Sequence, residues 1–283
     1  MDGPPPVSPA AYKRATVETW DEVAPRYHSK WAGPGAGPFG CADMLLDEVG
    51  ISAGDAVLDV GCGTGAATRH IMERVGPGGL VIGVDASDTA LRIASEYGIP
   101  PNLMYVNADA EAMPLAARFD MAVCQFAIFF FPDAPAALRN MISMTKPGGR
   151  LGVAVHGTLE EVPYHGCLLR EIPSYIPDYI PPGAPALDRY SEAGALRGLA
   201  GGAGYHDISV QTMAYRYSPG DFDAYWNGYV GYISEAQRRK IRALGPHRMG
   251  ELREAVRRNT IPYTGPDGTI SFPWQVLILT ASA

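Results

Sequence analysis

The sequence predicts an α/β protein with a doubly wound, mostly parallel sheet of seven strands, a Rossmann-like arrangement with a helical lid inserted between the last two strands. Three observations lead to this prediction. Short, continuously apolar runs alternate with helical patterns between residues 56 and 155, as is typical of parallel strands that helices cover on both faces. A glycine-rich turn follows the first run, and about fifty residues separate the last two predicted strands.

The composition excludes several classes of protein. The chain has 283 residues, of which 47% are hydrophobic, and a formal net charge of −7. This length suffices for one large domain with a sizeable core. Because nucleic-acid binders usually present a basic surface to the phosphates, the negative charge disfavours DNA or RNA as the main partner. A small molecule is the expected partner.

The cysteines and the N-terminus bear on the compartment. Cys41, Cys62, Cys124 and Cys167 are scattered and form no C-x-x-C pair, which fits a reducing compartment and predicts neither a disulfide framework nor a metal site. The N-terminus lacks the basic and apolar regions of a signal peptide. No apolar run approaches the roughly 18 residues that a membrane span needs. We therefore expect a cytoplasmic protein without a membrane span.

The N-terminal 40 residues are predicted to form a leader and a first helix. Residues 1–10 contain four prolines and are expected to be mobile. A helix is expected over 11–20, ending before Pro25, because proline lacks the amide hydrogen that a helix interior needs. A loop rich in glycine and proline follows over 32–40, and a short helix is expected over 42–49.

The central sheet is predicted from five short apolar runs, separated by helical patterns and turns. The runs are 56–60, 80–85, 102–107, 119–124 and 151–155. The helical patterns are 66–75, 88–97 and 134–145. The turn Pro147-Gly-Gly leads into the fifth run.

The C-terminal part is less regular, and no element is predicted over 157–186. A helix is expected over 188–203 and strands over 208–217 and 271–280. Helical stretches between these two strands are expected over 220–232, 234–243 and 247–258. Because a hairpin connection needs only two to five residues, we interpret this insertion as a lid over the carboxyl edge of the sheet. The predicted units are 1–40, the leader and first helix; 41–217 with 263–283, the core domain; and 218–262, the lid.

Two features of the lid region allow two interpretations each. Of the 15 tyrosines, 11 lie between Tyr164 and Tyr263, and they either form the walls of a ligand site or pack the lid onto the core. A basic run over 238–242, with Arg253, Arg257 and Arg258 beyond it, either recognises an anionic group of a substrate or forms a solvated helix face.

The glycine-rich turn is the first functional motif. Gly61, Gly63 and Gly65 lie between an apolar strand and a helix, where glycine allows a tight turn and a close approach of a ligand to the backbone. The helix N-terminus that follows can hold a negative group. The pattern also fits the dinucleotide fingerprint G-x-G-x-x-A, and a tight strand-to-helix turn without a ligand is the third interpretation.

Three acids lie near the ends of three successive predicted strands and favour a cationic ligand. Asp59 lies within the first strand, where a buried carboxylate needs a partner such as an ammonium group. Asp85 ends the second strand, where an acid can bind a ribose diol. Asp109 follows the third strand and either reaches an adenine amino group or caps a helix. Together they predict a negative pocket, which suits a sulfonium better than a pyrophosphate.

Taken in order, these motifs resemble the class I S-adenosylmethionine-dependent methyltransferases. The stretch Val57-Leu-Asp-Val-Gly-Cys-Gly-Thr-Gly65 is similar to the first motif of that family. The similarity continues through Val84-Asp85, Ala108-Asp-Ala110, Phe119-Asp120 and Lys146-Pro-Gly-Gly149. Residues 20–27 and 124–133 resemble the ubiquinone/menaquinone-biosynthesis branch. The resemblance covers roughly residues 15–155.

The resemblance implies S-adenosylmethionine as the cofactor, S-adenosylhomocysteine as the product and a Rossmann-like methyltransferase fold. The backbone of the glycine turn would hold the methionine part, the acid after the second strand the ribose, and the residues after the third strand the adenine. The cofactor-binding set that it implies is Tyr27, Asp59, Gly61, Gly63, Gly65, Asp85, Ala86, Asp109, Ala110, Cys124 and Gln125.

The expected function is methyl transfer to a small-molecule acceptor, quinone-like or a natural product, at carbon, oxygen or nitrogen. A methyltransferase-like protein that binds the cofactor but catalyses a non-methylating step is one alternative. A NAD(P)-dependent oxidoreductase, which shares the glycine turn, is another.

Two histidines are candidates for a catalytic base, which is needed when the acceptor must lose a proton. His156 ends the fifth strand at the expected ligand edge, and its ordinary pKa suits a base near neutral pH. His28 follows the segment over residues 20–27 and is the second candidate. A surface or packing role is the alternative for both.

Overall fold

The computed structural model describes residues 8–31, 37–180, 184 and 186–283. The first seven residues and part of the predicted loop over 32–40 lie outside this described part. Seven strands form one sheet: β1 (Ala56–Val60), β2 (Leu80–Asp85), β3 (Leu103–Asn107), β4 (Phe119–Gln125), β5 (Thr145–His156), β6 (His206–Gly220) and β7 (Ile270–Ser282).

The sheet is doubly wound, as the sequence predicted. Its strand order is β3-β2-β1-β4-β5-β7-β6. The chain builds outward from β1 in one direction and then returns to add β4 and β5 on the other side, all of them parallel. Strand β7 runs antiparallel to both of its neighbours. The carboxyl ends of the parallel strands therefore meet at one edge.

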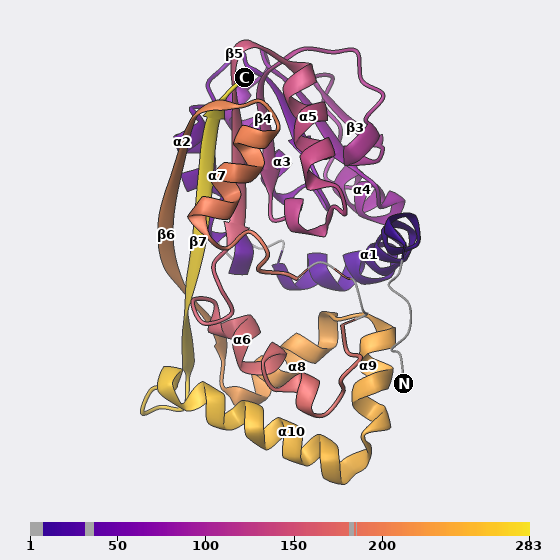
Figure 1. Cartoon of the computed structure of the whole chain (residues 1–283), viewed down its shortest axis with the longest axis vertical. Helices are drawn as coiled ribbons and strands as arrows, with labels where there is room; N and C mark the ends of the chain where they lie inside the picture. The colour runs from indigo at the N-terminus through magenta and orange to yellow at the C-terminus, as the bar shows by residue number, and fades with distance from the viewer. Residues whose placement is uncertain (1–7, 32–36, 181–183, 185) are drawn as a thin grey trace.

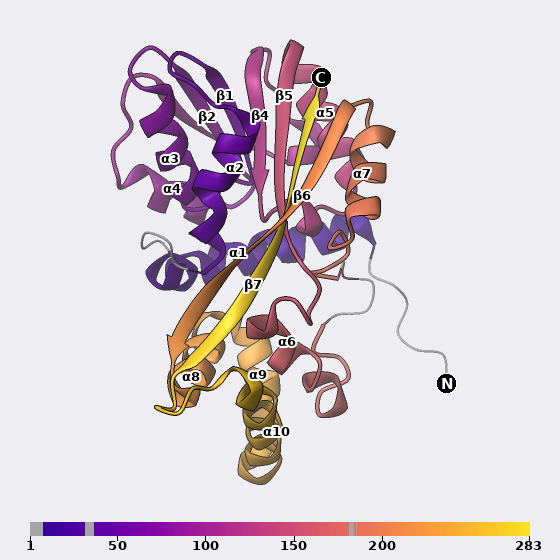
Figure 2. The same ribbon diagram turned by 90° about the vertical axis from the view of Figure 1, so that its left-hand side faces the viewer.

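Ten α-helices occur in the described residues. They are α1 (Pro9–Trp31), α2 (Ala42–Val49), α3 (Ala66–Val75), α4 (Asp88–Ser95), α5 (Ala134–Met144), α6 (Pro163–Leu169), α7 (Ala193–Gly202), α8 (Phe222–Tyr232), α9 (Glu235–Ala243) and α10 (Gly245–Thr260). Helix α2 contacts α3 on one side of the sheet, and α5 contacts α7 on the other (Figure 2).

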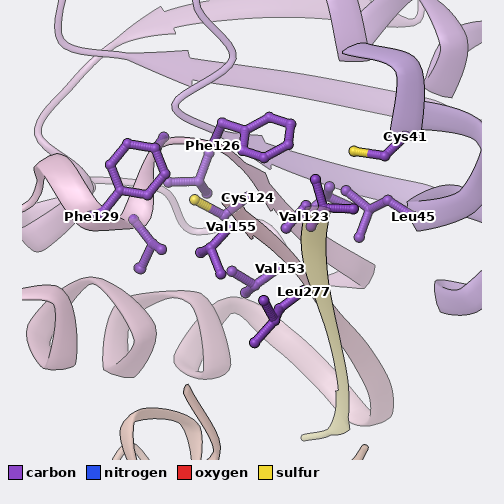
Figure 3. Close-up of a cluster of buried hydrophobic side chains, with 14 of the residues drawn as sticks. Cys41, Leu45, Val123, Cys124, Phe126, Phe129, Val153, Val155 and Leu277 are labelled. Carbon is purple, nitrogen blue, oxygen red and sulfur yellow. The ribbon is translucent and has the colours of Figure 1, made fainter. Parts of the chain in front are cut away.

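The core lies between the sheet and these helices. Val57, Leu58 and Val60 of β1 are fully buried, because a strand in the middle of the sheet has helices on both faces. Figure 3 shows part of this core, in which side chains of β4, β5 and β7 meet. Burial of such side chains is the main favourable term in folding.

Helices α8, α9 and α10 lie between β6 and β7 in the chain. Strands β6 and β7 extend past the rest of the sheet to reach these helices, and α1 lies between the sheet and the lid (Figures 1 and 2). This placement is consistent with the insertion that the sequence predicted, and it brings α1 and the lid to the carboxyl edge.

The prediction that the first helix ends before Pro25 is wrong. Helix α1 runs through Pro25 and ends at Trp31. Val23, Ala24 and Trp31 are buried, so the packing of the second half of the helix offsets the hydrogen bond that proline cannot form.

Helix α6 occupies part of the segment for which no element was predicted. It begins at Pro163, a position where the missing amide hydrogen costs nothing, because the first helical amides have no partner within the helix. A Cβ on Gly166 would lie 1.8 Å from the carbonyl oxygen of Leu159. Glycine therefore allows this short helix to pack directly on the preceding backbone.

Among the described residues, no helix combines the length and the apolar character needed to cross a bilayer. In the same residues, no three His, Cys, Asp or Glu side chains are placed to hold a metal ion.

Candidate functional site

A cavity of about 100 Å³ lies at the carboxyl edge of the sheet, beneath α1. Its floor comes from the segments that follow β1, β2, β3 and β4, and its roof comes from α1. The floor includes Gly61, Asp85, Ala86, Asp109 and Ala110, and the roof includes Lys13, Thr16, Val17 and Trp20. A wider opening of about 860 Å³ adjoins it and shares several lining residues. Five residues of the predicted cofactor-binding set therefore surround one cavity.

The glycine turn is built from residues in the left-handed backbone conformation. Gly61, Gly63 and Gly65 have φ angles of 71°, 55° and 76°. A Cβ on Gly61 would lie 2.3 Å from the Cβ of Ala127, and one on Gly65 would lie 2.8 Å from the hydroxyl of Tyr105. A Cβ on Gly63 would meet no atom within 4 Å. The turn therefore needs glycine for close packing at two positions and leaves open space at the third.

Asp85 fixes the turn from the end of β2. Its Oδ2 accepts a hydrogen bond from the backbone amide of Gly63 at 2.8 Å, and its Oδ1 accepts one from the amide of Ser87 at 2.8 Å. Burial raises the pKa of this carboxyl, and the two amides oppose that shift. The carboxylate thus joins the loops after β1 and β2.

Asp59 lies in β1, near Asp85 at the end of β2, and is 1% exposed. Its Oδ2 accepts a hydrogen bond from the Thr68 hydroxyl at 2.6 Å. Burial raises the pKa of Asp59 to about 7, and the charge of Asp85 adds to this rise. Within the described part of the chain, neither carboxylate forms an ion pair. Asp59 lines neither cavity, and Lys13 of the roof pairs with other carboxylates, so neither acid has a cationic partner among the described residues.

Asp109 caps a helix with one carboxylate oxygen and contacts a lysine with the other. Its Oδ1 accepts a hydrogen bond from the amide of Glu111 at 2.9 Å and caps a short 3-10 helix, so the capping interpretation describes one oxygen. Its Oδ2 lies 2.6 Å from Nζ of Lys13 on α1, which also lies 2.6 Å from Oε2 of Glu111. A lysine of the roof thus holds the carboxylate that was expected to meet adenine.

Two residues of the predicted cofactor-binding set, at the end of β4, line neither cavity. Burial raises the pKa of Cys124 to about 12, so it is a neutral thiol. Gln125 is 6% exposed, and its amide nitrogen lies 3.8 Å from Sγ of Cys41. Its Oε1 is buried, and no residue of the described chain donates to it. That oxygen is therefore a buried acceptor without a donor among the described residues.

Asp21 connects α1, the roof of the cavity, to the segment that follows β2. Its Oδ1 accepts hydrogen bonds from the hydroxyl of Ser87 at 2.6 Å and from the amide of Thr89 at 3.0 Å. Tyr27 lies further along α1 and contacts Trp20 edge-on, with 5.3 Å between ring centroids. Tyr27 lines neither cavity, and its ring faces that of Tyr232 in the lid, with 6.4 Å between centroids.

His156 ends β5 and is 7% exposed. Its Nδ1 accepts a hydrogen bond from Nε1 of Trp274 at 3.2 Å. Burial holds the pKa of His156 well below its usual range, and the nearby His165 lowers it further. The ring is therefore neutral near pH 7.

His28 is not brought to the cavity. Its Nε2 lies 2.6 Å from the hydroxyl of Tyr97, which follows α4 and is 56% exposed. The catalytic role that the sequence suggested for His28 therefore has no support from its position.

The lid packs on the core mainly through aromatic side chains. The Tyr225 hydroxyl donates to the carbonyl oxygen of Tyr164 at 2.8 Å, and the Tyr229 hydroxyl lies 3.3 Å from Nδ1 of His165. Trp31 at the end of α1 also contacts Tyr164 edge-on. These contacts support the packing interpretation for this part of the tyrosine set.

The basic residues of the lid are largely paired. Arg238 contacts Glu235, and both Arg253 and Arg257 contact Asp223. Lys240 contacts Asp178. These ion pairs favour the interpretation as a solvated helix face.

Several residues of the cavity could not be found by sequence reasoning. Lys13, Thr16 and Val17 precede every motif that carries the resemblance to a known family. They enter the site because α1 crosses the sheet edge, and no local pattern signals that contact. Ala127 could have been found, because it lies two residues after β4 and the carboxyl ends of parallel strands meet at one edge.

Comparison with known proteins gives a consistent result. A family described as a methyltransferase domain matches residues 57–149. The ubiquinone/menaquinone biosynthesis C-methyltransferase of Idiomarina loihiensis is 30% identical over 188 residues, which cover 59% of this chain and 73% of that protein. The corresponding protein of Pasteurella multocida is 40% identical over 113 residues, 38% of this chain and 42% of that protein.

Nocamycin O-methyltransferase of Saccharothrix syringae is 35% identical over 116 residues, 40% of this chain and 41% of that protein. The matches to it and to the Pasteurella protein thus span less than half of each relative. Among solved structures, phosphoethanolamine N-methyltransferase 2 of Haemonchus contortus, in complex with phosphomonomethylethanolamine and S-adenosylhomocysteine, has a TM-score of 0.58 at 18% identity. That match covers 98% of this chain and 60% of the other, and it shows the shared fold.

Proposed function

Because the chain belongs to the class I S-adenosylmethionine-dependent methyltransferases, we propose that it transfers the methyl group of S-adenosylmethionine to a small-molecule acceptor held between α1, the sheet edge and the lid. The observation that carries the proposal is the pair Asp59 and Asp85. Both carboxylates have raised pKa values, and in the described chain neither has a cationic partner. A cationic ligand would stabilise both charges.

The residues present fit this cofactor. The space beside Gly63 admits a ligand against the backbone, and the unpaired Oε1 of Gln125 can accept a hydrogen bond from an ammonium group. Asp85 would bind the ribose, while Asp109 and Ala110 would hold the adenine. Ala86 would contribute to the same wall. A bound pyrophosphate would instead meet two carboxylates, which disfavours NAD(P).

The bound cofactor supplies an electrophilic methyl group, and the protein contributes orientation and exclusion of water. Trp20 and Val17 cover the cavity from α1, and this apolar roof would keep water from the reacting atoms. Asp59 and Asp85 would fix the cofactor from below. The acceptor would bind on the lid side, where Tyr27 and Trp31 connect α1 to the tyrosines of the lid.

The class of acceptor is proposed from the relatives and from the aromatic lid. The relatives include both a C-methyltransferase and an O-methyltransferase, so the family accommodates either chemistry. Aromatic walls favour a flat, largely apolar molecule. We therefore propose a quinone-like or related natural-product acceptor.

The first experiment tests the cofactor. S-adenosylhomocysteine should raise the melting temperature of the full chain, because a ligand that binds only the folded state stabilises it. NAD(P) should not. The Asp85→Asn variant should lose most of the stabilisation. The matched control is Asp88→Asn, since Asp88 is exposed and contacts only Arg92 among the described residues. Stabilisation by NAD(P) alone would contradict the proposal.

The second experiment tests the reaction. Transfer of a labelled methyl group from S-adenosylmethionine to phenols, naphthols and β-diketones should yield at least one methylated product. Tight binding of S-adenosylhomocysteine without transfer to any acceptor, but with another conversion of the substrate, would favour the non-methylating alternative.

A further inference from the structure

The hydrogen bonding of His156 determines which of its nitrogens carries the proton. Nδ1 lies 3.2 Å from Nε1 of Trp274, and both side chains are buried. An indole N–H can only donate a hydrogen bond. Nδ1 must therefore be the acceptor, and in the neutral ring the hydrogen is on Nε2.

The surroundings of His156 hold the ring in this state. Phe126 stacks on it with 4.2 Å between ring centroids and an interplanar angle of 14°. The ring of His165, on α6, lies 5.4 Å from that of His156, measured between centroids, and is itself buried. Its Nδ1 faces the hydroxyl of Tyr229 on α8. No carboxylate lies against the His156 ring among the described residues, so nothing there stabilises an imidazolium, and burial disfavours the charged form.

The backbone under this stack is unusual. Phe126 has a φ angle of 54°, a left-handed conformation that costs energy for a bulky residue and that clusters at functional sites. Its amide donates to the carbonyl oxygen of Ala154 at 2.9 Å. Phe126 directly precedes Ala127, which lines the cavity under α1. The histidine is therefore stacked on the residue next to the proposed cofactor site.

The Nε2–H group has no acceptor within the described residues. Nε2 is not among the unpartnered side-chain atoms that are fully buried, so a ligand can reach it, and an oxygen atom of that ligand would accept its hydrogen. This free N–H donor of His156 therefore indicates where the ligand binds and that the ligand carries a hydrogen-bond acceptor.

We propose that His156 donates a hydrogen bond from Nε2 to an oxygen of the methyl acceptor and does not serve as the catalytic base. This inference rests on the proposed function and specifies its substrate class. The acceptor carries a carbonyl, enolate or phenolate oxygen on or beside the methylated atom. The hydrogen bond favours the ionised form of such an oxygen, so the proton leaves the acceptor for solvent before the methyl group moves.

The tautomer can be tested without a substrate. Long-range ¹H–¹⁵N spectra of the full chain, with ¹⁵N-labelled histidine, distinguish Nε2–H from Nδ1–H, and the His156→Gln variant assigns the signal. We expect a pure Nε2–H tautomer that does not titrate between pH 5.5 and 8. Trp274→Phe should produce a mixture of tautomers, whereas the control His165→Gln should not. An Nδ1–H tautomer, or titration near pH 6.5, would overturn the proposal.

The contact with the acceptor needs an oxygenated probe. In the presence of S-adenosylhomocysteine, millimolar 2-naphthol or acetylacetone should shift the Nε2 signal, and naphthalene should not. The absence of any shift with both oxygenated probes would overturn the contact. With the acceptor identified, His156→Phe should raise its KM about 10- to 150-fold, the effect of one hydrogen bond to a charged group, and should move the rise of kcat/KM to higher pH, because the acceptor then ionises less readily.

The two hypotheses fail differently. If S-adenosylhomocysteine does not stabilise the chain, the proposed function fails while the tautomer result stands. If the cofactor binds but the Nε2 signal titrates as a base should, only the present proposal fails.

Discussion

The ammonium group of Lys13 lies 2.6 Å from a carboxylate oxygen of Asp109, although 96 residues separate the two in the chain. The same nitrogen lies 2.6 Å from Glu111. This contact closes α1 over a cavity of about 100 Å³, well below the roughly 300 Å³ at which ligand pockets begin. Lys13 also lines the adjoining opening of about 860 Å³, so a ligand that enters the cavity from that opening passes these contacts.

Replacing Lys13 by Met should make cofactor entry easier. The ion pair is partly exposed, and such pairs contribute about 0–1 kcal/mol, so we expect the association rate of S-adenosylhomocysteine to rise about two- to fivefold. Stopped-flow fluorescence, which reports on Trp20 in the roof, measures this rate. Lys146→Met is the control, because Lys146 pairs with Asp120 at the other end of the sheet. A slower association for Lys13→Met would show that Lys13 assists the ligand instead.

The glycine turn should be intolerant of a side chain at Gly63. Valine there would fill the open space and force a branched residue into a left-handed backbone, so we expect no measurable binding of S-adenosylmethionine by calorimetry. Gly78→Ala, at an open position away from the cavity, should bind as the wild type does.

Asp85→Asn should weaken binding by about 1.5–3 kcal/mol, because an amide can accept only one of the two backbone hydrogen bonds. Unchanged affinity in Asp85→Asn would refute the ribose assignment.

The sheet could be predicted because its signals are local. The run over residues 56–60 coincides with β1, since a strand buried on both faces must be apolar throughout. Asp85 and Asp109 could be placed at one edge because parallel strands end there together. These predictions need only the residue pattern of short segments and the rule that the carboxyl ends of parallel strands meet at one edge of the sheet.

The roof of the site could not be predicted in this way. Helix α1 continues past Pro25 because Trp31 packs against Trp274 and Tyr164, which are far along the chain. The same long-range packing brings Lys13 to Asp109. Local propensity at Pro25 argued for a helix end, and tertiary contacts overrode it.

Asp59 should make the unliganded protein less stable as the pH rises. Its pKa in the folded state is about 7, above the ordinary value of 3.8, because burial penalises the charge. The folded state therefore binds more protons than the unfolded state between these values, and stability falls by about 1.4 kcal/mol for each pH unit within that window.

The Asp59→Asn variant should lose this dependence and should exceed the wild type in stability most clearly at pH 8. Urea unfolding at pH 5 and pH 8 measures the difference. Asp120→Asn provides the contrast, because Lys146 lowers the pKa of Asp120 and that substitution should remove stability at both pH values. An equal effect of Asp59→Asn at pH 5 and pH 8 would show that Asp59 is not protonated on burial.

The arginines of α10 should contribute to stability and not to acceptor binding. Arg253 and Arg257 both contact Asp223 and lie over the ring of Phe222. Changing both to Ala should lower the free energy of unfolding by about 1–2 kcal/mol through the lost ion pairs and cation–π contacts. The KM for the acceptor should stay the same. A rise in that KM with unchanged cofactor binding would revive the interpretation as a substrate-recognition site.

His165 should make the protein sensitive to acid. Burial lowers its pKa from 6.5 to about 3, so below pH 6.5 the unfolded chain takes up a proton that the folded chain does not. Stability from this residue is complete above pH 6.5 and falls by about 1.4 kcal/mol per pH unit below it, down to the folded-state pKa. Between pH 7.5 and pH 5 the loss amounts to about 2 kcal/mol.

His165→Gln should remove that loss. The stability of this variant should therefore decline less than that of the wild type on acidification, even if it is lower at pH 7.5. His247→Gln, at an exposed position of α10, should follow the wild type. If the free energy of unfolding falls equally with pH in the wild type and in His165→Gln, His165 gains a proton in the folded protein. The lid would then have to open in acid or admit water to this histidine.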